Sequence, residues 1–178
     1  NATSTRWQPR GSQVFQDSFR WYAGVEGPKY DVAEAKRLAE EAKADGWDGK
    51  VRLVTPNAPG PTNIGLAVQT LLGAAGIEAI VDSNKATADH LQVVTVQKDF
   101  DMTWWGLNIG NDDGAMVPLS QMASTNPSNR VGFKSATLDA ALTQLRAADT
   151  DEKKTAAFKI IAEEMAEQLP VIPYAVTE

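Results

Sequence analysis

The chain has 178 residues, a formal net charge of −6 and no cysteine, with 43 % hydrophobic and 22 % charged residues. This length and composition are those of a globular protein with a sizeable core. The acidic balance argues against nucleic acid or an anionic membrane surface as the main partner, since both need a basic face. The lack of cysteine excludes disulfides, thiolate nucleophiles and cysteine-based metal sites within this sequence.

Residues 1–29 are polar and broken by glycine and proline, yet they carry many large apolar side chains. A solvated tail would not hold so many aromatic residues. We therefore expect an irregular arm over residues 1–29 that packs on the α/β part of the chain, residues 30–178. The side chains concerned are Trp7, Val14, Phe15, Phe19, Trp21 and Tyr22.

The first regular element begins at Asp31, which has the spacing of a capping box with Glu34. Apolar residues then recur on one helical face, and Gly46 is a natural stop. A short strand over Val51–Val54 follows. The apolar stripe consists of Ala35, Leu38, Ala39 and Ala42.

The segment from Thr55 to Asn63 contains three prolines and reads as a rigid loop, with Thr62 or Asn63 capping the next helix. That helix has an apolar stripe from Ile64 to Ala75 and ends at Gly76. A second strand is expected over Ile77–Val81, a weakly patterned helix over residues 84–97, and a third strand over Asp101–Trp105.

Strands that alternate with helices at this spacing predict βαβ units, right-handed crossovers and a mainly parallel sheet. Ligands of such sheets bind beyond the carboxyl ends of the strands. The loops that follow Val54 and Trp105 should therefore open toward the same edge.

The last third of the chain is predicted to be mostly helical. A short helix is expected over Ala115–Met122, and Ser135 and Thr150 have the character of caps for two longer ones. Pro170 ends the second of these, and Val171–Tyr174 reads as a short last strand at a sheet edge.

The third strand ends in two tryptophans and a loop rich in glycine, asparagine and aspartate. Successive strand side chains point to opposite faces, so Trp104 and Trp105 cannot both enter one core. A flat apolar wall beside a few polar groups is what a small-molecule site needs. The alternative is a purely structural role, since most tryptophans are core residues and such a loop is usually a turn.

Signals for catalysis or metal binding are sparse. His90, the only histidine, has no ligand partner at metal spacing and is expected at the surface. Calcium at Asn111, Asp112 and Asp113 lacks the twelve-residue loop pattern and stays a minor possibility. Asp99 and Asp101 share a strand face, which would suit paired catalytic carboxylates, but a solvated strand entry explains them as well. No cofactor is implied.

Several segments, in order, resemble the family 5 extracellular solute-binding proteins of bacteria, the peptide/nickel type that serve ABC importers. The resemblance covers about residues 30–174. It rests on Tyr30-Asp31 with Ala35-Lys36-Arg37-Leu38 and Gly46-Trp47, Gln69 with Leu72 and Gly76-Ile77, Phe100-Asp101 with Trp105, Leu138-Asp139, and Leu169-Pro170-Val171-Ile172-Pro173.

The resemblance implies a periplasmic-binding-protein-like (type II) α/β lobe, here the second lobe alone, with residues 1–29 near the hinge. It implies capture of a peptide or similar solute between two lobes and delivery to ABC permease subunits, outside the cytoplasm, with any lipoprotein anchor and the first lobe lying outside this sequence. Asn108 stands where peptide binders of the family have an aspartate for the ligand ammonium, and Asn111 or Asp112 stands at their second aspartate. A neutral ligand such as an oligosaccharide therefore stays open.

Three functions are compatible with these features. The first is a non-enzymatic binding lobe in which Trp105 and Trp104 form the wall and Asn108, Asn111 and Asp112 the polar contacts. The second is a carboxylate enzyme that uses Asp99 with Asp101 or Asp112 with Asp113. The third is a protein-interaction domain that docks a partner through the aromatic arm.

Overall fold

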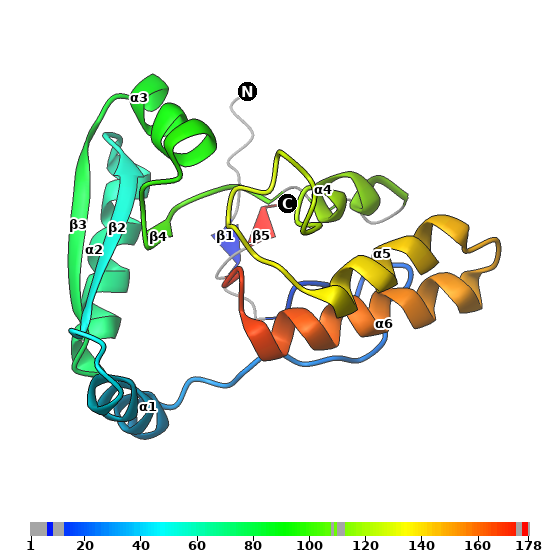
Figure 1. Ribbon diagram of the computed structural model, residues 1–178, viewed down its shortest axis with the longest axis horizontal. Helices are drawn as coiled ribbons and strands as arrows, with labels where there is room; N and C mark the ends of the chain where they lie inside the picture. Colours follow the sequence, from blue (N-terminus) through cyan, green and yellow to red (C-terminus); the bar gives the residue numbers. More distant parts are fainter. Residues whose placement is uncertain (1–6, 9–12, 108, 110–112, 174–175, 178) are drawn as a thin grey trace. The chain divides into compact units, whose positions relative to one another are not determined.

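A computed structural model describes residues 7–8, 13–107, 109, 113–173 and 176–177. The chain divides into two compact units, which are described separately (Figure 1). The sheet unit is Tyr30–Gly106, and the helical unit joins Asn1–Lys29 to Leu107–Glu178.

The sheet unit begins with α1, Val32–Ala44, whose cap is the predicted one. The Asp31 carboxylate accepts a hydrogen bond from the Glu34 backbone N–H at 3.0 Å. The predicted apolar stripe is only partly buried, because Ala39 is covered whereas Leu38 is 50 % exposed. The helix is also attached by its last turn, where Lys43 Nζ donates to the Gly76 carbonyl at 2.8 Å.

Three parallel strands form the sheet, in the order β3-β2-β4. They are β2, Lys50–Pro56, β3, Glu78–Lys85, and β4, Met102–Thr103. The parallel arrangement predicted from the βαβ pattern is confirmed. The third strand is shorter than predicted, since only Met102 and Thr103 pair with Leu53 and Val54 of β2.

Helix α2, Pro59–Ala74, packs against β2 and β3 and begins earlier than predicted. Pro59 and Pro61 lie in its first turn, where a missing N–H costs nothing, so the proline-rich segment starts the helix instead of delaying it. Neither Thr62 nor Asn63 is the cap: Ala58 holds that position without a side-chain bond. Gly65 is buried where the helix approaches the sheet.

The weak helical pattern after β3 corresponds to two short pieces. Helix α3, Thr87–Gln92, continues into a π-helical turn, η1, over Val93–Gln97, and Lys98 then adopts a left-handed conformation. Val93 and Val94 are buried, so packing explains why valines close together are tolerated in this turn.

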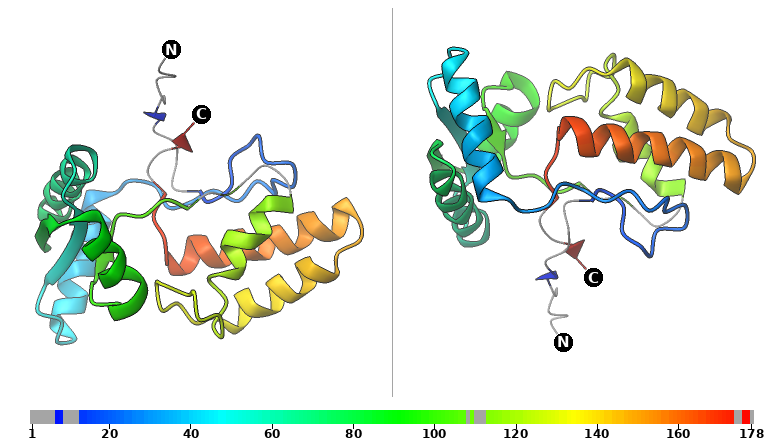
Figure 2. Two further views of the ribbon diagram at one scale, coloured as in Figure 1. Left: turned by 90° about the horizontal axis from the view of Figure 1, so that it is seen from above. Right: turned by 90° about the horizontal axis from the view of Figure 1, so that it is seen from below.

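The helical unit is built around two long helices that lie side by side (Figure 2). They are α5, Ala136–Ala147, and α6, Asp151–Gln168, preceded by the short η2, Asp113–Ala115, and α4, Met116–Ser120. Both predicted caps are present: Ser135 accepts from the Leu138 N–H and Thr150 from the Lys153 N–H. Helix α6 ends before Pro170, as expected, with Leu169 in a left-handed conformation.

Aromatic side chains from the first thirty residues complete the core of this unit. Phe158 of α6 makes edge contacts with Phe15 and Phe19, at 5.3 and 4.8 Å between ring centroids, and stacks on Trp21 at 5.4 Å. The Trp21 indole N–H also donates to the Asp151 carboxylate at 3.0 Å. All four rings are buried.

The predicted last strand is misplaced. Val171, Ile172 and Pro173 are not in a strand, and Tyr174 lies outside the described residues. Two prolines so close together leave few N–H donors for a ladder. Instead β5, Val176–Thr177, pairs antiparallel with β1, Trp7–Gln8.

Candidate functional site

The candidate site lies where β2 and β4 end next to each other in the sheet unit. Val54 of β2 is in register with Thr103 of β4, so the two strands finish at the same edge. The Trp104 backbone N–H still donates to the Val54 carbonyl, at 3.4 Å. The two tryptophans therefore occupy the carboxyl edge of the sheet, the place where parallel sheets bind ligands.

Three of the five predicted site residues lie outside the described residues: Asn108, Asn111 and Asp112. The other two are placed. Trp104 is half-buried, whereas Trp105 leaves 37 % of its surface exposed. An exposed indole at this edge offers a flat apolar surface.

His90 lies against Trp105, and sequence reasoning missed this. The imidazole of α3 and the Trp105 ring stack with 6.0 Å between centroids and 28° between planes. The expectation that His90 is a surface residue is wrong, since only 4 % of it is exposed. No local signal pointed to this contact, because α3 is short and the two residues meet only once the sheet is assembled.

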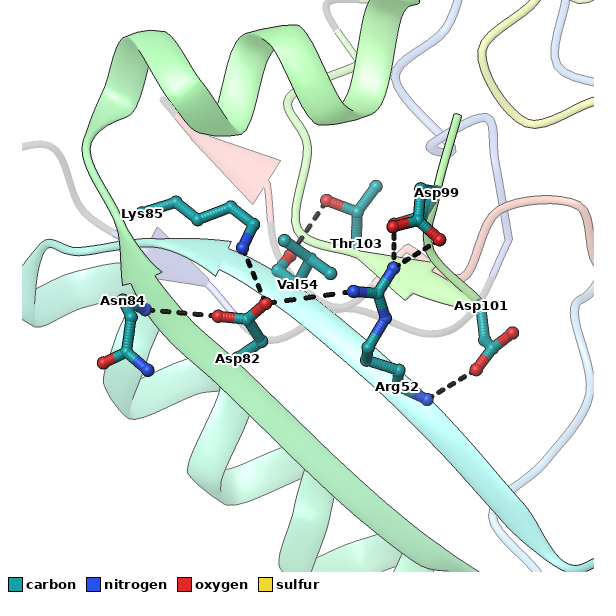
Figure 3. A network of polar contacts seen from close by, with 8 residues as sticks. All are labelled: Arg52, Val54, Asp82, Asn84, Lys85, Asp99, Asp101 and Thr103. Atoms are coloured by element: carbon teal, nitrogen blue, oxygen red, sulfur yellow. Dashed lines mark hydrogen bonds and ion pairs between the residues drawn. The ribbon is translucent and has the colours of Figure 1, made fainter. Parts of the chain in front are cut away.

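A hydroxyl group holds the His90 ring. His90 Nε2 lies 3.0 Å from Thr103 Oγ1, and that hydroxyl donates to the Val54 carbonyl at 2.9 Å (Figure 3 draws the second contact). The hydroxyl and the ring nitrogen are within hydrogen-bond distance, and the tautomer of His90 determines which of the two donates. Burial lowers the pKa of His90 below its ordinary value, which favours the neutral ring.

Asp99 and Asp101, the first pair of carboxylates considered for catalysis, are engaged with Arg52 (Figure 3). Asp99 pairs with the Arg52 guanidinium at 2.7 Å, and its backbone carbonyl accepts from the same group. The Asp101 carboxylate accepts the Arg52 backbone N–H at 2.7 Å. These contacts tie the segment before β4 to β2, which is a structural role.

A charge network continues from Arg52 to β3. Asp82 of β3 lies 4.0 Å from Arg52 and 2.9 Å from Lys85 Nζ. The hydrogen bond from Lys85 is the main reason why the pKa of Asp82 is lowered, and the Asn84 N–H and Arg52 act in the same direction.

A hollow of about 370 Å³ lies beside α3, with walls that are mostly polar. Ligand sites are usually lined mainly by apolar groups, so the hollow alone does not define one. Its lining residues are Asn84, Lys85, Asp89, Gln92, Val93 and Gln97. Across the described part of the chain, no cluster of three or more acidic, histidine or cysteine residues is placed to hold a metal ion.

Among the described helices, none is long and apolar enough to cross a membrane. No protein-family model and no curated protein sequence matches the chain. Similarity is found in solved structures instead.

CtaP, an ABC transporter substrate-binding protein from Listeria monocytogenes, is 21 % identical, with a TM-score of 0.80 over 96 % of this chain and 35 % of its own. DppA from Helicobacter pylori, solved with the peptide STSA, is 20 % identical, with a TM-score of 0.74 over 95 % of this chain and 33 % of its own. The chain has the fold of part of a substrate-binding protein. A third example, from Microbacterium hydrocarbonoxydans and complexed with 4-hydroxybenzoate hydrazide, is 17 % identical, with a TM-score of 0.70 over 99 % of this chain and 36 % of its own.

The predicted resemblance and the predicted α/β class with a parallel sheet are thus confirmed at the level of the fold. The chain spans about a third of the length of the substrate-binding proteins that it resembles. Two of these were solved with different ligand classes, a peptide and an aromatic hydrazide. The shared fold therefore leaves the ligand class of this chain to be argued from its own residues.

Proposed function

We propose that the chain is the second lobe of a substrate-binding protein that captures a peptide or similar small solute between two lobes and delivers it to ABC permease subunits. The observation that carries the proposal is the fold, shared with such proteins over nearly the whole chain. The first lobe and any lipoprotein anchor belong to the full-length protein, which works outside the cytoplasm, in the periplasm or at the cell surface.

Trp105 forms the apolar wall of the ligand site in this proposal. Its exposed ring stands at the carboxyl edge of the sheet, and Trp104 supports the same edge from its half-buried position. Asn108, Asn111 and Asp112, which follow within a few residues, supply the polar contacts. A flat ring with a few amide and carboxylate groups suits a peptide backbone or a sugar face.

Asn108 favours a second candidate within the same class, a neutral solute such as an oligosaccharide. A neutral amide both donates and accepts hydrogen bonds but cannot form a charge-assisted bond with an ammonium group. Such bonds are about twice as strong as neutral ones. For a peptide N-terminus, the proposal then assigns the role of negative partner to Asp112.

The other two functional classes have less support. A carboxylate enzyme that uses Asp99 with Asp101 would need both carboxylates available, yet both are held by Arg52. The alternative pair, Asp112 with Asp113, is not tested, since Asp112 lies outside the described residues. A partner-docking arm would need exposed aromatic rings, yet Phe15, Phe19 and Trp21 are buried within their own unit.

The test is a thermal-shift and calorimetry screen of the full-length protein against a free tetrapeptide, the same peptide acetylated at its N-terminus, and maltotriose. Ligand at a hundred times its Kd should stabilise the protein by about 2.7 kcal/mol. Trp105→Ala should abolish binding, whereas Trp47→Ala should not, because Trp47 precedes β2 at the opposite end of the sheet.

A peptide that binds equally well with and without the acetyl group would assign recognition to the neutral amides, and a strong preference for the free amine would assign it to Asp112. Binding of maltotriose alone would favour the neutral solute. Retention of full affinity in Trp105→Ala would overturn the site, and no response to any of these solutes would count against the proposed ligand classes.

A further inference from the structure

One side of the Trp105 ring is placed against a side chain that no functional class discussed above uses. His90 comes from α3 and Trp105 follows β4, so their 6.0 Å stacking contact joins two elements on either side of η1. His90 is buried and Trp105 is partly exposed. The imidazole is thus an internal support for a ring that is itself partly exposed.

The support is itself fixed in orientation. The Thr103 hydroxyl lies 3.0 Å from His90 Nε2, and it is also within hydrogen-bond distance of the Val54 carbonyl at 2.9 Å and the Trp104 carbonyl at 3.4 Å. This contact therefore restrains the orientation of the imidazole. A chain of contacts then runs from the β2 backbone through Thr103 and His90 to Trp105.

We propose that His90 is a positioning residue for the ligand wall, holding the Trp105 indole in the plane in which it receives the solute. The inference rests on the proposed function, since it assigns a task to a neighbour of the proposed wall. Preorganisation of this kind raises affinity because the ring is ordered before the ligand arrives. His90 itself, being buried, does not need to touch the solute.

The neutral state of the imidazole is part of this arrangement. A second ring proton would place a charge in a buried position, which is unfavourable. Charged groups on the neighbouring elements mostly pair with one another. Arg52 pairs with Asp82 and Asp99, and Lys85 also pairs with Asp82. The Asp101 carboxylate accepts from the Arg52 backbone N–H, and Asp89 lies on α3 itself. Removal of the Trp105 ring should therefore expose His90 to water and raise its pKa toward the ordinary value.

The only histidine of the chain gives a direct readout by nuclear magnetic resonance, since its imidazole protons need no assignment among others. In Trp105→Leu the pKa of His90 should rise, and its ring protons should lose the upfield shift caused by the stacked indole. An unchanged pKa together with unchanged shifts would overturn the contact on which the inference depends.

The reciprocal variants test positioning. The chain has five tryptophans, so the Trp105 indole N–H signal is identified by its loss in Trp105→Phe. His90→Ala should increase the fast motion of this indole, His90→Phe should restore order by returning a flat ring, and the Trp47 signal should stay unchanged as a control for folding. Equal order of Trp105 in wild type and His90→Ala would refute the inference.

The binding readout separates this inference from the proposed function. For the peptide that binds the wild-type full-length protein best, His90→Ala should weaken affinity by roughly two- to tenfold, the range expected when an aromatic pair is lost, with His90→Phe recovering most of it. Unaltered affinity in His90→Ala, beside lost affinity in Trp105→Ala, would overturn positioning and leave the wall standing. If no solute binds, the proposed function fails, and the magnetic resonance signals still report whether His90 orders the indole.

Discussion

The close approach of α2 to the sheet predicts different effects for the same substitution at two glycines of one helix. A Cβ at Gly65 would lie 3.0 Å from Val81 Cγ1, 3.4 Å from Thr55 Cγ2 and 3.7 Å from Leu53 Cδ2. A Cβ at Gly73 would meet no atom within 4 Å. Both positions are helical, so replacement by alanine brings each a favourable conformational term of about 0.5–1 kcal/mol.

The packing term decides the outcome at Gly65. Val81 would have to move by a few tenths of an ångström, and the added Cβ would also touch Thr55, which is fully buried. Overpacking of this kind costs about 1–3 kcal/mol. We therefore expect Gly73→Ala to stabilise the chain and Gly65→Ala to be the less stable of the two by about 1–3 kcal/mol.

Urea unfolding followed by far-ultraviolet circular dichroism measures this difference, with both variants compared with wild type at one temperature. The slope with denaturant should be the same for the three proteins, so that a shift in the midpoint reports stability alone. If Gly65→Ala is as stable as Gly73→Ala, the helix does not lie as close to the strands as described, and the argument from the missing Cβ is refuted.

Three further predictions concern the aromatic core, a helix cap and a carboxylate. Phe158→Ala removes the ring that contacts three buried aromatic side chains and should cost about 3–5 kcal/mol in thermal unfolding, whereas Phe158→Leu should cost clearly less. Ser135→Ala loses the cap of α5 and the hydrogen bond to Glu164, so urea unfolding should show a loss of at least about 1 kcal/mol. Asp82→Asn should be less stable than wild type at neutral pH, and the difference in their free energies of unfolding should become smaller in acid. The pKa of Asp82 is lowered chiefly by Lys85, so its carboxylate stabilises the fold above its ordinary pKa of about 4, and this contribution is lost as the pH falls through the lowered pKa. Unfolding at several pH values checks this, and a difference in stability that grows in acid would contradict it.

Local signals allowed the helix starts at Asp31, Ser135 and Thr150 to be predicted, because a cap depends on the side chain and the next three residues alone. The parallel sheet was predictable for a similar reason, since the alternation of strands and helices extends along the sequence. The start of α2 was missed because proline both breaks and begins helices, and only the chain direction after Pro56 distinguishes the two.

The site was predictable only in part. The two tryptophans drew attention by being adjacent, and their place at the carboxyl edge followed from the strand pattern. His90 gave no such signal, because its burial depends on a contact with Thr103, a neighbour thirteen positions away in the sequence, and on the exact path of η1 between them. No short stretch of the sequence carries a signal for contacts that form only in the assembled sheet.

Arg52 has a consequence for how the sheet avoids alternative alignments. β4 pairs with β2 through only two residues, which by itself would specify register weakly. Arg52 reaches Asp82 on one side and Asp99 on the other, so a slip of either flanking strand by one residue would turn a carboxylate away from the guanidinium. These ion pairs therefore favour one alignment of the strands, the alignment in which Trp105 and not its neighbour stacks on His90.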